Sequence, residues 1–253
     1  MRISIVTPSY NQAEYLEETI LSVLGQGYPD LEYIVIDGDS SDGTHAILDR
    51  FAGQLAYVQS RPDGGQTDAL IQGFGRATGE ILAWLNSDDL YEPHTLHEVA
   101  RWFRDNPEDR FIYGDATWVD HRGRVIRRKR EMGFNRFVWL RTYNYIPQPS
   151  AFWRRELFDE VGGLDPTYDL AMDSDLFARF SDRTNPRHVS RLWSRMRSHP
   201  DQKNIRLRAV SDEEDERIRR RHGVATGTRG SLERSLARIA RIATRAMSGA
   251  YWR

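Results

Sequence analysis

Cysteine is absent from the 253-residue sequence, and lysine is nearly absent. Without thiols the chain cannot form thiolate zinc sites, iron–sulfur clusters or a cysteine nucleophile. Lys129 and Lys203 are the two lysines among 36 basic residues, and neither lies in a GxxxxGK[ST] motif. A phosphate-binding P-loop is therefore excluded.

Long apolar runs are missing as well. No stretch approaches 18 apolar residues, so we expect no membrane-spanning helix. A strand-like run over residues 3–7 follows Met1 and Arg2 directly, which is unlike the hydrophobic segment of a signal peptide. We therefore expect a cytoplasmic location.

The charges are unevenly distributed although the net charge is -1. Residues 1–120 hold 7 basic and 21 acidic side chains, whereas residues 121–253 hold 29 basic and 16 acidic ones. Clustered carboxylates indicate a cation site in the first half, and the positive half favours an anionic acceptor or surface. Solvated faces of opposite sign would explain the same split. We expect no nucleic-acid partner.

Strand-like and helix-period segments alternate through the first 115 residues. This order predicts an α/β protein with a mostly parallel, Rossmann-like sheet flanked by helices. The expected strands are residues 3–7, 31–36, 56–60 and 81–85. Beyond residue 115 the pattern changes to a hairpin around His121-Arg122-Gly123 and then to short aromatic segments.

Three helix starts can be predicted from capping chemistry. Asn11 is a suitable N-cap with Glu14 three residues later, as in a capping box. Pro93 is expected at the first position of another helix. A third helix should start at Ala171-Met172-Asp173.

Polar loops follow three of the predicted strands, where ligands bind in open α/β sheets. These loops are residues 8–11, 37–40 and 86–89. Asp88 and Asp89 come directly after a hydrophobic strand, and buried carboxylates need a partner. Mg²⁺ or Mn²⁺ is a suitable partner because both prefer oxygen ligands. A helix-capping turn would explain the same residues equally well.

The order of the motifs resembles that of family 2 glycosyltransferases with a GT-A fold, over residues 1 to about 200. Further motifs continue the resemblance downstream, at residues 148–155, 161–165 and 172–176. The resemblance implies that Pro8 and Tyr10 flank a nucleobase and that Asp37 accepts hydrogen bonds from the base or ribose. The nucleotide-binding residues expected on this basis are Thr7, Pro8, Tyr10, Asn11, Asp37, Asp68, Asn86, Ser87 and Asp88.

The resemblance also implies a metal site. Asp88 matches the family's metal ligand, and His199 resembles a histidine that reaches the metal or the diphosphate. The family usually has an acid at position 86, where this chain has Asn86, which could still hydrogen-bond ribose. His199 could equally be an ordinary loop residue, and Asp68 could simply cap a helix after a glycine turn. Arg197 and Lys203 could contact the diphosphate, although surface solvation explains them as well.

Asp173 matches the family's catalytic base, although the usual Glu-Asp pair is Met172-Asp173 here. The chemistry needs a base because the acceptor hydroxyl must lose its proton as it attacks the anomeric carbon. Attack opposite the leaving nucleoside diphosphate inverts that carbon. A helix N-terminus also favours an acid at this position without any catalytic role.

The expected organisation is a GT-A domain over residues 1–210 and a charged helical tail over residues 211–253. Within the domain, residues 1–115 would bind the nucleotide and residues 116–210 the acceptor. The sequence predicts a basic amphipathic helix over residues 231–251, with Leu232, Leu236 and Ile239 on its apolar face. This helix could lie on the inner face of the plasma membrane, or it could pack in a homo-oligomer.

The resemblance predicts an inverting, metal-dependent transfer from a nucleoside-diphosphate sugar, with UDP as the favoured nucleotide. The acceptor would be a saccharide or a lipid-linked saccharide, as in bacterial polysaccharide biosynthesis. A non-catalytic nucleotide-sugar or saccharide-binding module is the alternative, because Asn86 and Met172 stand where acids are usual.

Overall fold

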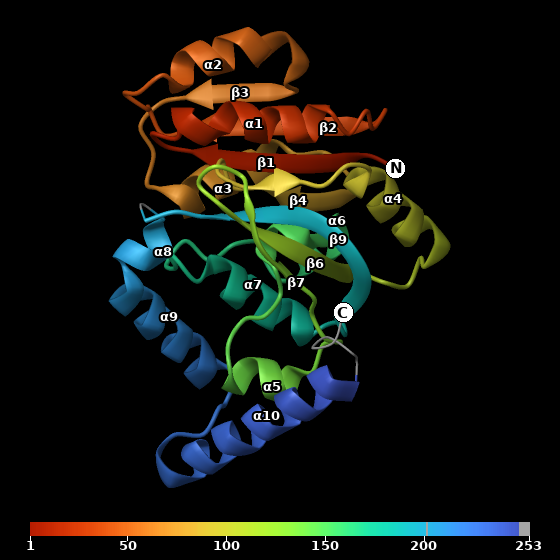
Figure 1. The fold of residues 1–253 in the computed structure, drawn as a ribbon, viewed down its shortest axis with the longest axis vertical. Helices are drawn as coiled ribbons and strands as arrows, with labels where there is room; N and C mark the ends of the chain where they lie inside the picture. Colours follow the sequence, from red (N-terminus) through yellow and green to blue (C-terminus); the bar gives the residue numbers. More distant parts are fainter. Residues whose placement is uncertain (201, 248–253) are drawn as a thin grey trace.

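A computed structural model describes residues 1–200 and 202–247. The strands of this part of the chain form one sheet with the order β3-β2-β1-β4-β8-β6-β9-β5, and β7 pairs with β6 off this path. Helices cover the sheet on both sides (Figure 1). The predicted α/β class, with a mostly parallel first half of the sheet flanked by helices, is confirmed.

The first half of the sheet is parallel. Strand β1 (Ile3–Ser9) pairs with β2 (Leu31–Asp37) and β4 (Ile81–Trp84), and β2 pairs with β3 (Tyr57–Ser60). Strands β1 and β4 are buried on both faces, as is typical of parallel sheets with helices on each side, whereas β3 at the edge is only partly buried. The connecting segments are α1 (Ala13–Leu24), α2 (Thr44–Phe51), η1 (Ala52–Gln54), α3 (Gln66–Arg76) and α4 (Thr95–Asp105).

The second half of the sheet is mixed. Strand β6 (Phe111–Asp120) pairs in parallel with β9 (Arg187–Ser198) and antiparallel with β8 (Ala151–Arg154). It also forms the predicted hairpin with β7 (Val125–Lys129). The short β5 (Leu90–Tyr91) pairs antiparallel with β9. The remaining elements are α5 (Arg136–Arg141), η2 (Gln148–Ser150), α6 (Arg155–Glu160), α7 (Met172–Ser181), α8 (Lys203–Arg206), α9 (Arg208–Arg221) and α10 (Gly227–Met247).

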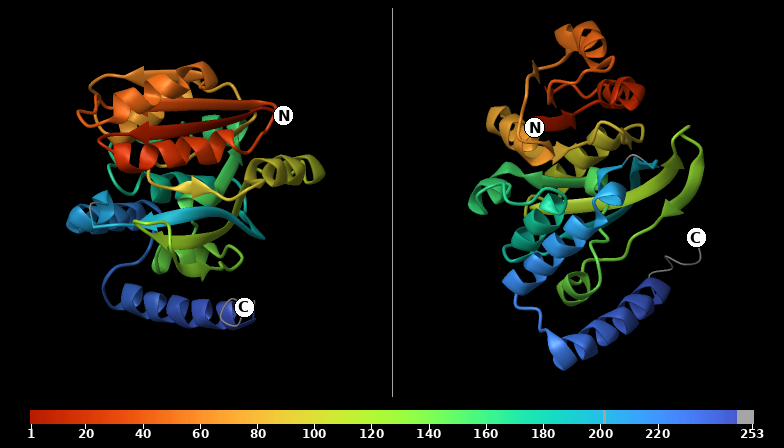
Figure 2. Two further views of the ribbon diagram at one scale, coloured as in Figure 1. Left: turned by 45° about the horizontal axis from the view of Figure 1, so that its top comes forward. Right: turned by 90° about the vertical axis from the view of Figure 1, so that its left-hand side faces the viewer.

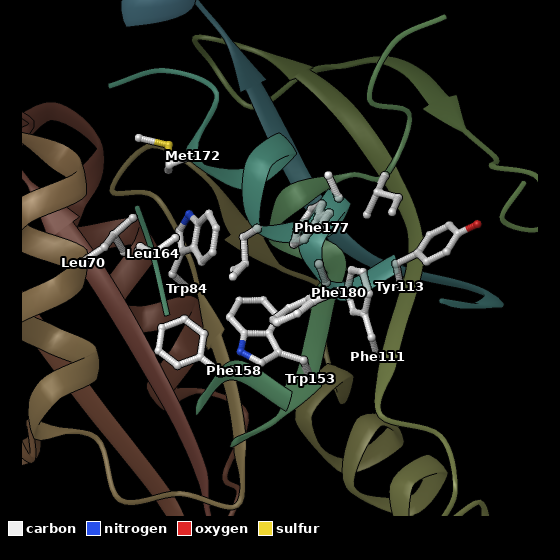
Figure 3. Packing of buried hydrophobic residues seen from close by; sticks show 14 of the residues in the cluster. Leu70, Trp84, Phe111, Tyr113, Trp153, Phe158, Leu164, Met172, Phe177 and Phe180 are labelled. Carbon is white, nitrogen blue, oxygen red and sulfur yellow. The ribbon is translucent and has the colours of Figure 1, made fainter. Parts of the chain in front are cut away.

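Buried aromatic side chains fill the core beneath α7. Trp84 and Trp153 make an edge contact with ring centroids 5.5 Å apart, and Phe111 lies 4.9 Å from Phe177 (Figure 3). Aromatic pairs in these tilted and edge geometries contribute stability beyond their buried area. This core fixes α7, and therefore Met172 at its first turn, against the end of β4.

Two of the three predicted helix starts are wrong. Helix α1 begins at Ala13 and has no side-chain cap, because the Asn11 side chain instead accepts a hydrogen bond from the Ser41 amide at 2.8 Å. Helix α4 begins at Thr95 rather than at Pro93, after His94 in a left-handed conformation. The start of α7 at Met172 is confirmed.

The C-terminal helices pack on the acceptor half. Helix α9 lies against α7, and α10 lies against α5 at the end of the molecule opposite α2 and β3 (Figure 2). The part of the predicted amphipathic helix beyond residue 247 lies outside the described residues. Within the described ranges, every helix is too short or too polar to cross a bilayer.

Candidate active site

A cavity of about 840 Å³ opens at the carboxyl ends of the parallel strands. The loops after β1 and β4 form one wall, and η2, the start of α7, the end of β9 and α8 form the other. The predicted site residues that line it are Pro8, Tyr10, Asn86, Ser87, Asp88, Asp173 and His199. The structure therefore brings together side chains that are up to 191 positions apart in the sequence, from Pro8 to His199.

Strand register explains why the loops that form the first wall of the cavity lie together. Ser9 is paired with Asp37, and the Leu85 amide donates to the Val6 carbonyl at 3.0 Å, so the three strands end at the same edge. The loops that follow these strands must then lie close together, as predicted. Tyr10 at the end of β1 is 63% exposed and is free to stack on a planar ligand.

The two predicted metal ligands meet in this cavity. The Nε2 atom of His199 lies 3.1 Å from Oδ2 of Asp88, and the Tyr15 ring packs against the imidazole with centroids 5.0 Å apart. Two ligands at about 2.1 Å from one octahedral ion lie roughly 3 Å apart, so the pair fits a divalent cation. The carboxylate and imidazole suit Mn²⁺, which can take its other ligands from water and phosphate. Among the described residues no group of three or more acids and histidines is arranged so that it could hold a metal ion.

Arg197 fixes the turn that carries Asp88. Its Nε donates to the Asp88 carbonyl at 3.0 Å, and its backbone amide donates to Oδ1 of Asp89 at 2.9 Å. A further guanidinium nitrogen lies 2.6 Å from Glu18 in α1. Burial and the neighbouring Asp88 charge raise the pKa of Asp89 well above its ordinary value. The guanidinium also donates to the His121 carbonyl at 3.1 Å, so it contacts protein groups on three sides.

Asn86 belongs to a chain of side-chain amides. Its Oδ1 accepts from Nε2 of Gln66 at 2.9 Å, and its Nδ2 donates to Oε1 of Gln148 at 3.3 Å. The Gln148 amide in turn donates to the Trp84 carbonyl at 2.8 Å. Donors and acceptors alternate along this chain, so an amide at position 86 satisfies both neighbours.

Asp173 lies in the first turn of α7 and faces the cavity. Its carboxylate accepts from the Ser174 amide at 2.7 Å and from the Asn144 side chain at 2.9 Å. Burial raises the pKa of Asp173 to about 6, and the negative charge of Asp215 adds to this shift. A carboxylate with this pKa is ionised at neutral pH and is a stronger proton acceptor than an ordinary aspartate, as general base catalysis requires.

Four predicted nucleotide-binding residues do not line the cavity. The Thr7 hydroxyl lies 3.0 Å from the Tyr33 hydroxyl, and the Asn11 amide is engaged by residue 41. Asp37 is buried and accepts hydrogen bonds from the hydroxyls of Ser40 and Ser60. Asp68 accepts from the amide of residue 64. Their contact with a nucleotide stays a prediction.

Sequence reasoning missed several polar residues of the cavity. Gln148 belongs to the motif at residues 148–155 and Gln66 follows the glycine turn before Asp68, but the amide chain depends on contacts between residues 20 and 62 positions apart. Asp63 and Arg206 also line the cavity and carry no local sequence signal. Lys203, which the resemblance already offered as a possible diphosphate contact, lines the cavity too, with its Nζ donating to the Asp169 carbonyl at 3.0 Å.

The fold and the cavity define a class: an α/β protein with an acidic ligand site at the carboxyl edge of its parallel strands. Residues 4–162 match the family model described as glycosyl transferase family 2. The chain belongs to this family, and the enzyme class expected from its motifs is confirmed.

Named relatives agree with this assignment. An uncharacterised glycosyltransferase of Mycobacterium tuberculosis, Rv1514c, is 30% identical over 179 residues, which cover 70% of this chain and 68% of that protein. A PGL/p-HBAD biosynthesis glycosyltransferase of Mycobacterium bovis is 33% identical over 74% of this chain and 72% of its own length. The O-antigen biosynthesis protein RfbC of Myxococcus xanthus is 32% identical over 72% of this chain but only 15% of its own length.

Solved structures share the fold, which confirms the GT-A arrangement expected from the motifs. TarS from S. aureus (residues 1–349), in complex with UDP-GlcNAc, superposes with a TM-score of 0.70 and 20% identity. This match covers 86% of the present chain and 64% of the TarS chain. The mannosyltransferase PcManGT from Pyrobaculum calidifontis, in complex with GDP-Man and Mn²⁺, gives a TM-score of 0.64 at 18% identity, covering 98% and 75% of the two chains.

Proposed function

We propose that the protein transfers a sugar, with inversion, from a nucleoside-diphosphate sugar to a saccharide or lipid-linked saccharide, in a metal-dependent reaction. The observation that carries this proposal is the presence of the Asp88–His199 pair and of Asp173 on one cavity. The ligands named for the TarS and PcManGT structures support a nucleotide-sugar donor, and we favour UDP. The name of RfbC supports a place in bacterial polysaccharide biosynthesis.

Asp88 and His199 would hold Mn²⁺ or Mg²⁺ against the donor diphosphate. The bound cation would stabilise the negative charge that develops on the leaving diphosphate. Tyr10 and Pro8 would lie against the base, and Asn86 and Ser87 would contact the nucleotide from the next loop. Thr7, Asn11, Asp37 and Asp68 would then support the residues that contact the nucleotide, or would reach the nucleotide after a local rearrangement of their loops.

Asp173 would accept the proton of the acceptor hydroxyl. As the hydroxyl oxygen forms its bond to the anomeric carbon, the bond from that carbon to the diphosphate oxygen breaks and its electron pair leaves with the diphosphate. Because attack comes from the face opposite the leaving group, the anomeric configuration inverts. The raised pKa of Asp173 supports this role.

The experiment that tests the donor site is calorimetric titration with UDP, GDP, UDP-GlcNAc and GDP-Man, with and without Mn²⁺. We expect tight binding of one nucleotide that depends on Mn²⁺ and on Asp88. Slow Mn²⁺-dependent hydrolysis of the matching sugar nucleotide would mark an enzyme. Binding without turnover on any acceptor would instead favour the non-catalytic module, which Asn86 and Met172 make the second candidate.

We also propose that α10 attaches the protein peripherally to an anionic membrane surface, such as the inner face of the plasma membrane, where a lipid-linked acceptor would lie. Apolar side chains on its outer face are exposed, with Leu232 at 62% and Ile239 at 64%. The sequence of α10 has five arginines and one acid, Glu233, which is paired with Arg141 at 2.9 Å. Arginines flanking an exposed apolar stripe complement anionic lipid headgroups.

Flotation with vesicles of phosphatidylglycerol and phosphatidylcholine tests this attachment. The full chain should float with the anionic vesicles and not with pure phosphatidylcholine, and the double variant Leu236→Ser, Ile239→Ser should stay behind. Leu21→Ser is the matched control, because Leu21 is a similarly exposed apolar residue on α1. Equal flotation of all variants would reject the membrane contact, and loss of a dimer in the double variant would favour a homo-oligomer.

A further inference from the structure

The loop that leads into α7 is held from three directions. The Thr67 hydroxyl in α3 donates to the Tyr168 carbonyl at 2.6 Å, and Lys203 in α8 donates to the Asp169 carbonyl. Leu170 in this loop lines the cavity next to Asp173. The loop therefore connects the candidate base to elements on both sides of the cleft.

The third contact comes from Glu214 in α9, a residue of the charged C-terminal segment. Its carboxylate accepts three consecutive backbone N–H groups: those of Asp169 at 2.8 Å, Leu170 at 2.9 Å and Ala171 at 2.8 Å. Glu214 is buried, so these bonds are little weakened by water. Hydrogen bonds to a charged acceptor are about twice as strong as neutral ones.

These bonds define where α7 begins. The Ala171 carbonyl accepts the Asp175 amide at 2.9 Å, which is the first turn of the helix. Asp173 lies within that turn, so the position of its carboxylate follows the position of residue 171. A loop whose amides pointed to water instead would allow the first turn to shift or fray.

Helix α9 is itself anchored to the body of the protein. Ile218 is buried in the core, and the Arg217 guanidinium lies 3.9 Å above the Tyr168 ring. Asp215, the residue after Glu214, contributes the negative charge that helps to raise the pKa of Asp173. Glu214 therefore reaches the loop from a rigid support.

We propose that Glu214 is a positioning residue that holds residues 169–171 and thereby places the Asp173 carboxylate in the cavity. The catalytic part of this inference rests on the proposed role of Asp173 as base. The stabilisation of residues 169–171 by Glu214 can be measured without any substrate.

Hydrogen–deuterium exchange and a carbon-13 titration of the Asp173 carboxyl, both on the full chain, test the inference. Glu214→Gln should speed exchange in peptides covering residues 168–173 by about tenfold or more, as loss of bonds to a charged acceptor predicts. Peptides from β1 and β4 should be unchanged, and the Asp173 titration should move toward its ordinary range as water gains access. Glu213→Gln on the exposed face of α9 is the matched control and should change neither readout.

Glu214→Asp, which keeps the charge but shortens the side chain, should give intermediate exchange and secures the test if the Gln variant fails to fold. The same exchange and titration as wild type in the Gln and Asp variants, or a uniform rise across the sheet, would overturn the inference. Asp173→Asn separates this outcome from failure of the proposed function. Normal sugar-nucleotide turnover in Asp173→Asn would reject Asp173 as the base. If Asp173→Asn loses turnover while Glu214→Gln leaves the loop unchanged, only the role of Glu214 is rejected.

Discussion

The two halves of the molecule bring side chains to the cavity in different ways. In residues 1–115 the site residues stand directly after parallel strands, and strand register sets their positions. In the second half they depend on side-chain contacts between distant segments: His199 with Asp88, and Glu214 with Ala171. The first wall of the cavity is thus a product of topology, and the second wall is a product of specific buried polar contacts.

This difference predicts how each wall should respond to substitution. A change in a strand-end loop should remove one function and leave its neighbours in place, because backbone pairing holds them. A change in a long-range polar contact should disturb geometry and stability together, because buried charged groups lose their partners.

Asp88→Ala should have the largest effect. We expect Mn²⁺-dependent sugar-nucleotide turnover to fall by about 10³-fold or more, because the charge that develops on the diphosphate loses its stabilisation. Asp88 also pairs with the buried His199, so the free energy of unfolding without metal should fall as well, but by less than in Arg197→Met because the Asp88 side chain is 17% exposed. Asp105→Ala, an exposed acid at the end of α4, is the control. Retained turnover in Asp88→Ala would falsify the metal role.

Asp173→Asn should lower kcat by about 10²–10⁴-fold while nucleotide binding persists. For the wild type, kcat should rise with pH through about 6, because the base must be ionised. Because the pKa of Asp173 is raised in the folded state, ionisation of this carboxyl destabilises the fold. The contribution of Asp173 to the free energy of unfolding is therefore greatest at low pH and is lost as pH rises through about 6. The free energy of unfolding of the Asn variant should therefore exceed that of wild type by about 1–3 kcal/mol at pH 7.5, and the two should be nearly equal at pH 4. A flat pH–rate profile would count against the assignment.

Much of the first wall could be predicted from sequence because βα periodicity is a local signal. It gave the strand ends, and therefore the loops with Asp37 and Asp88. The capping role expected of Asn11 failed because a tertiary partner, Ser41, takes its side chain. Pairing of Asp88 with His199, 111 residues away, could be anticipated only through the family resemblance. Nothing near Glu214 in the sequence indicates that it faces the loop before α7.

Arg197→Met tests the long-range type of contact directly. We expect a loss of about 3–5 kcal/mol in the free energy of unfolding, because the variant leaves buried polar groups without their charged partner. Mn²⁺ affinity should fall as well, since the guanidinium holds the Asp88 carbonyl. Arg195→Met is the matched control on the same strand. Its side chain is 42% exposed and pairs with Glu92, so a change of about 0–1 kcal/mol is expected. Denaturant unfolding measures both variants. Equal losses in the free energy of unfolding for Arg197→Met and Arg195→Met would contradict the distinction between buried long-range contacts and exposed ion pairs.

Asn86→Asp should have the smallest effect and shows where the two walls meet. An aspartate would face Oε1 of Gln148 with an acceptor, and Gln148 cannot simply turn its amide because its Nε2 already donates to the Trp84 carbonyl. Without metal we expect a loss of about 1–2 kcal/mol, the usual cost of an unsatisfied buried polar pair. If the cation lies beside residue 86, Mn²⁺ should shrink this difference, because the added carboxylate then gains a charged partner. Thermal unfolding with and without Mn²⁺ measures both quantities. An equal loss under both conditions would mean that the Asn86 amide serves the chain of amides and not the cation.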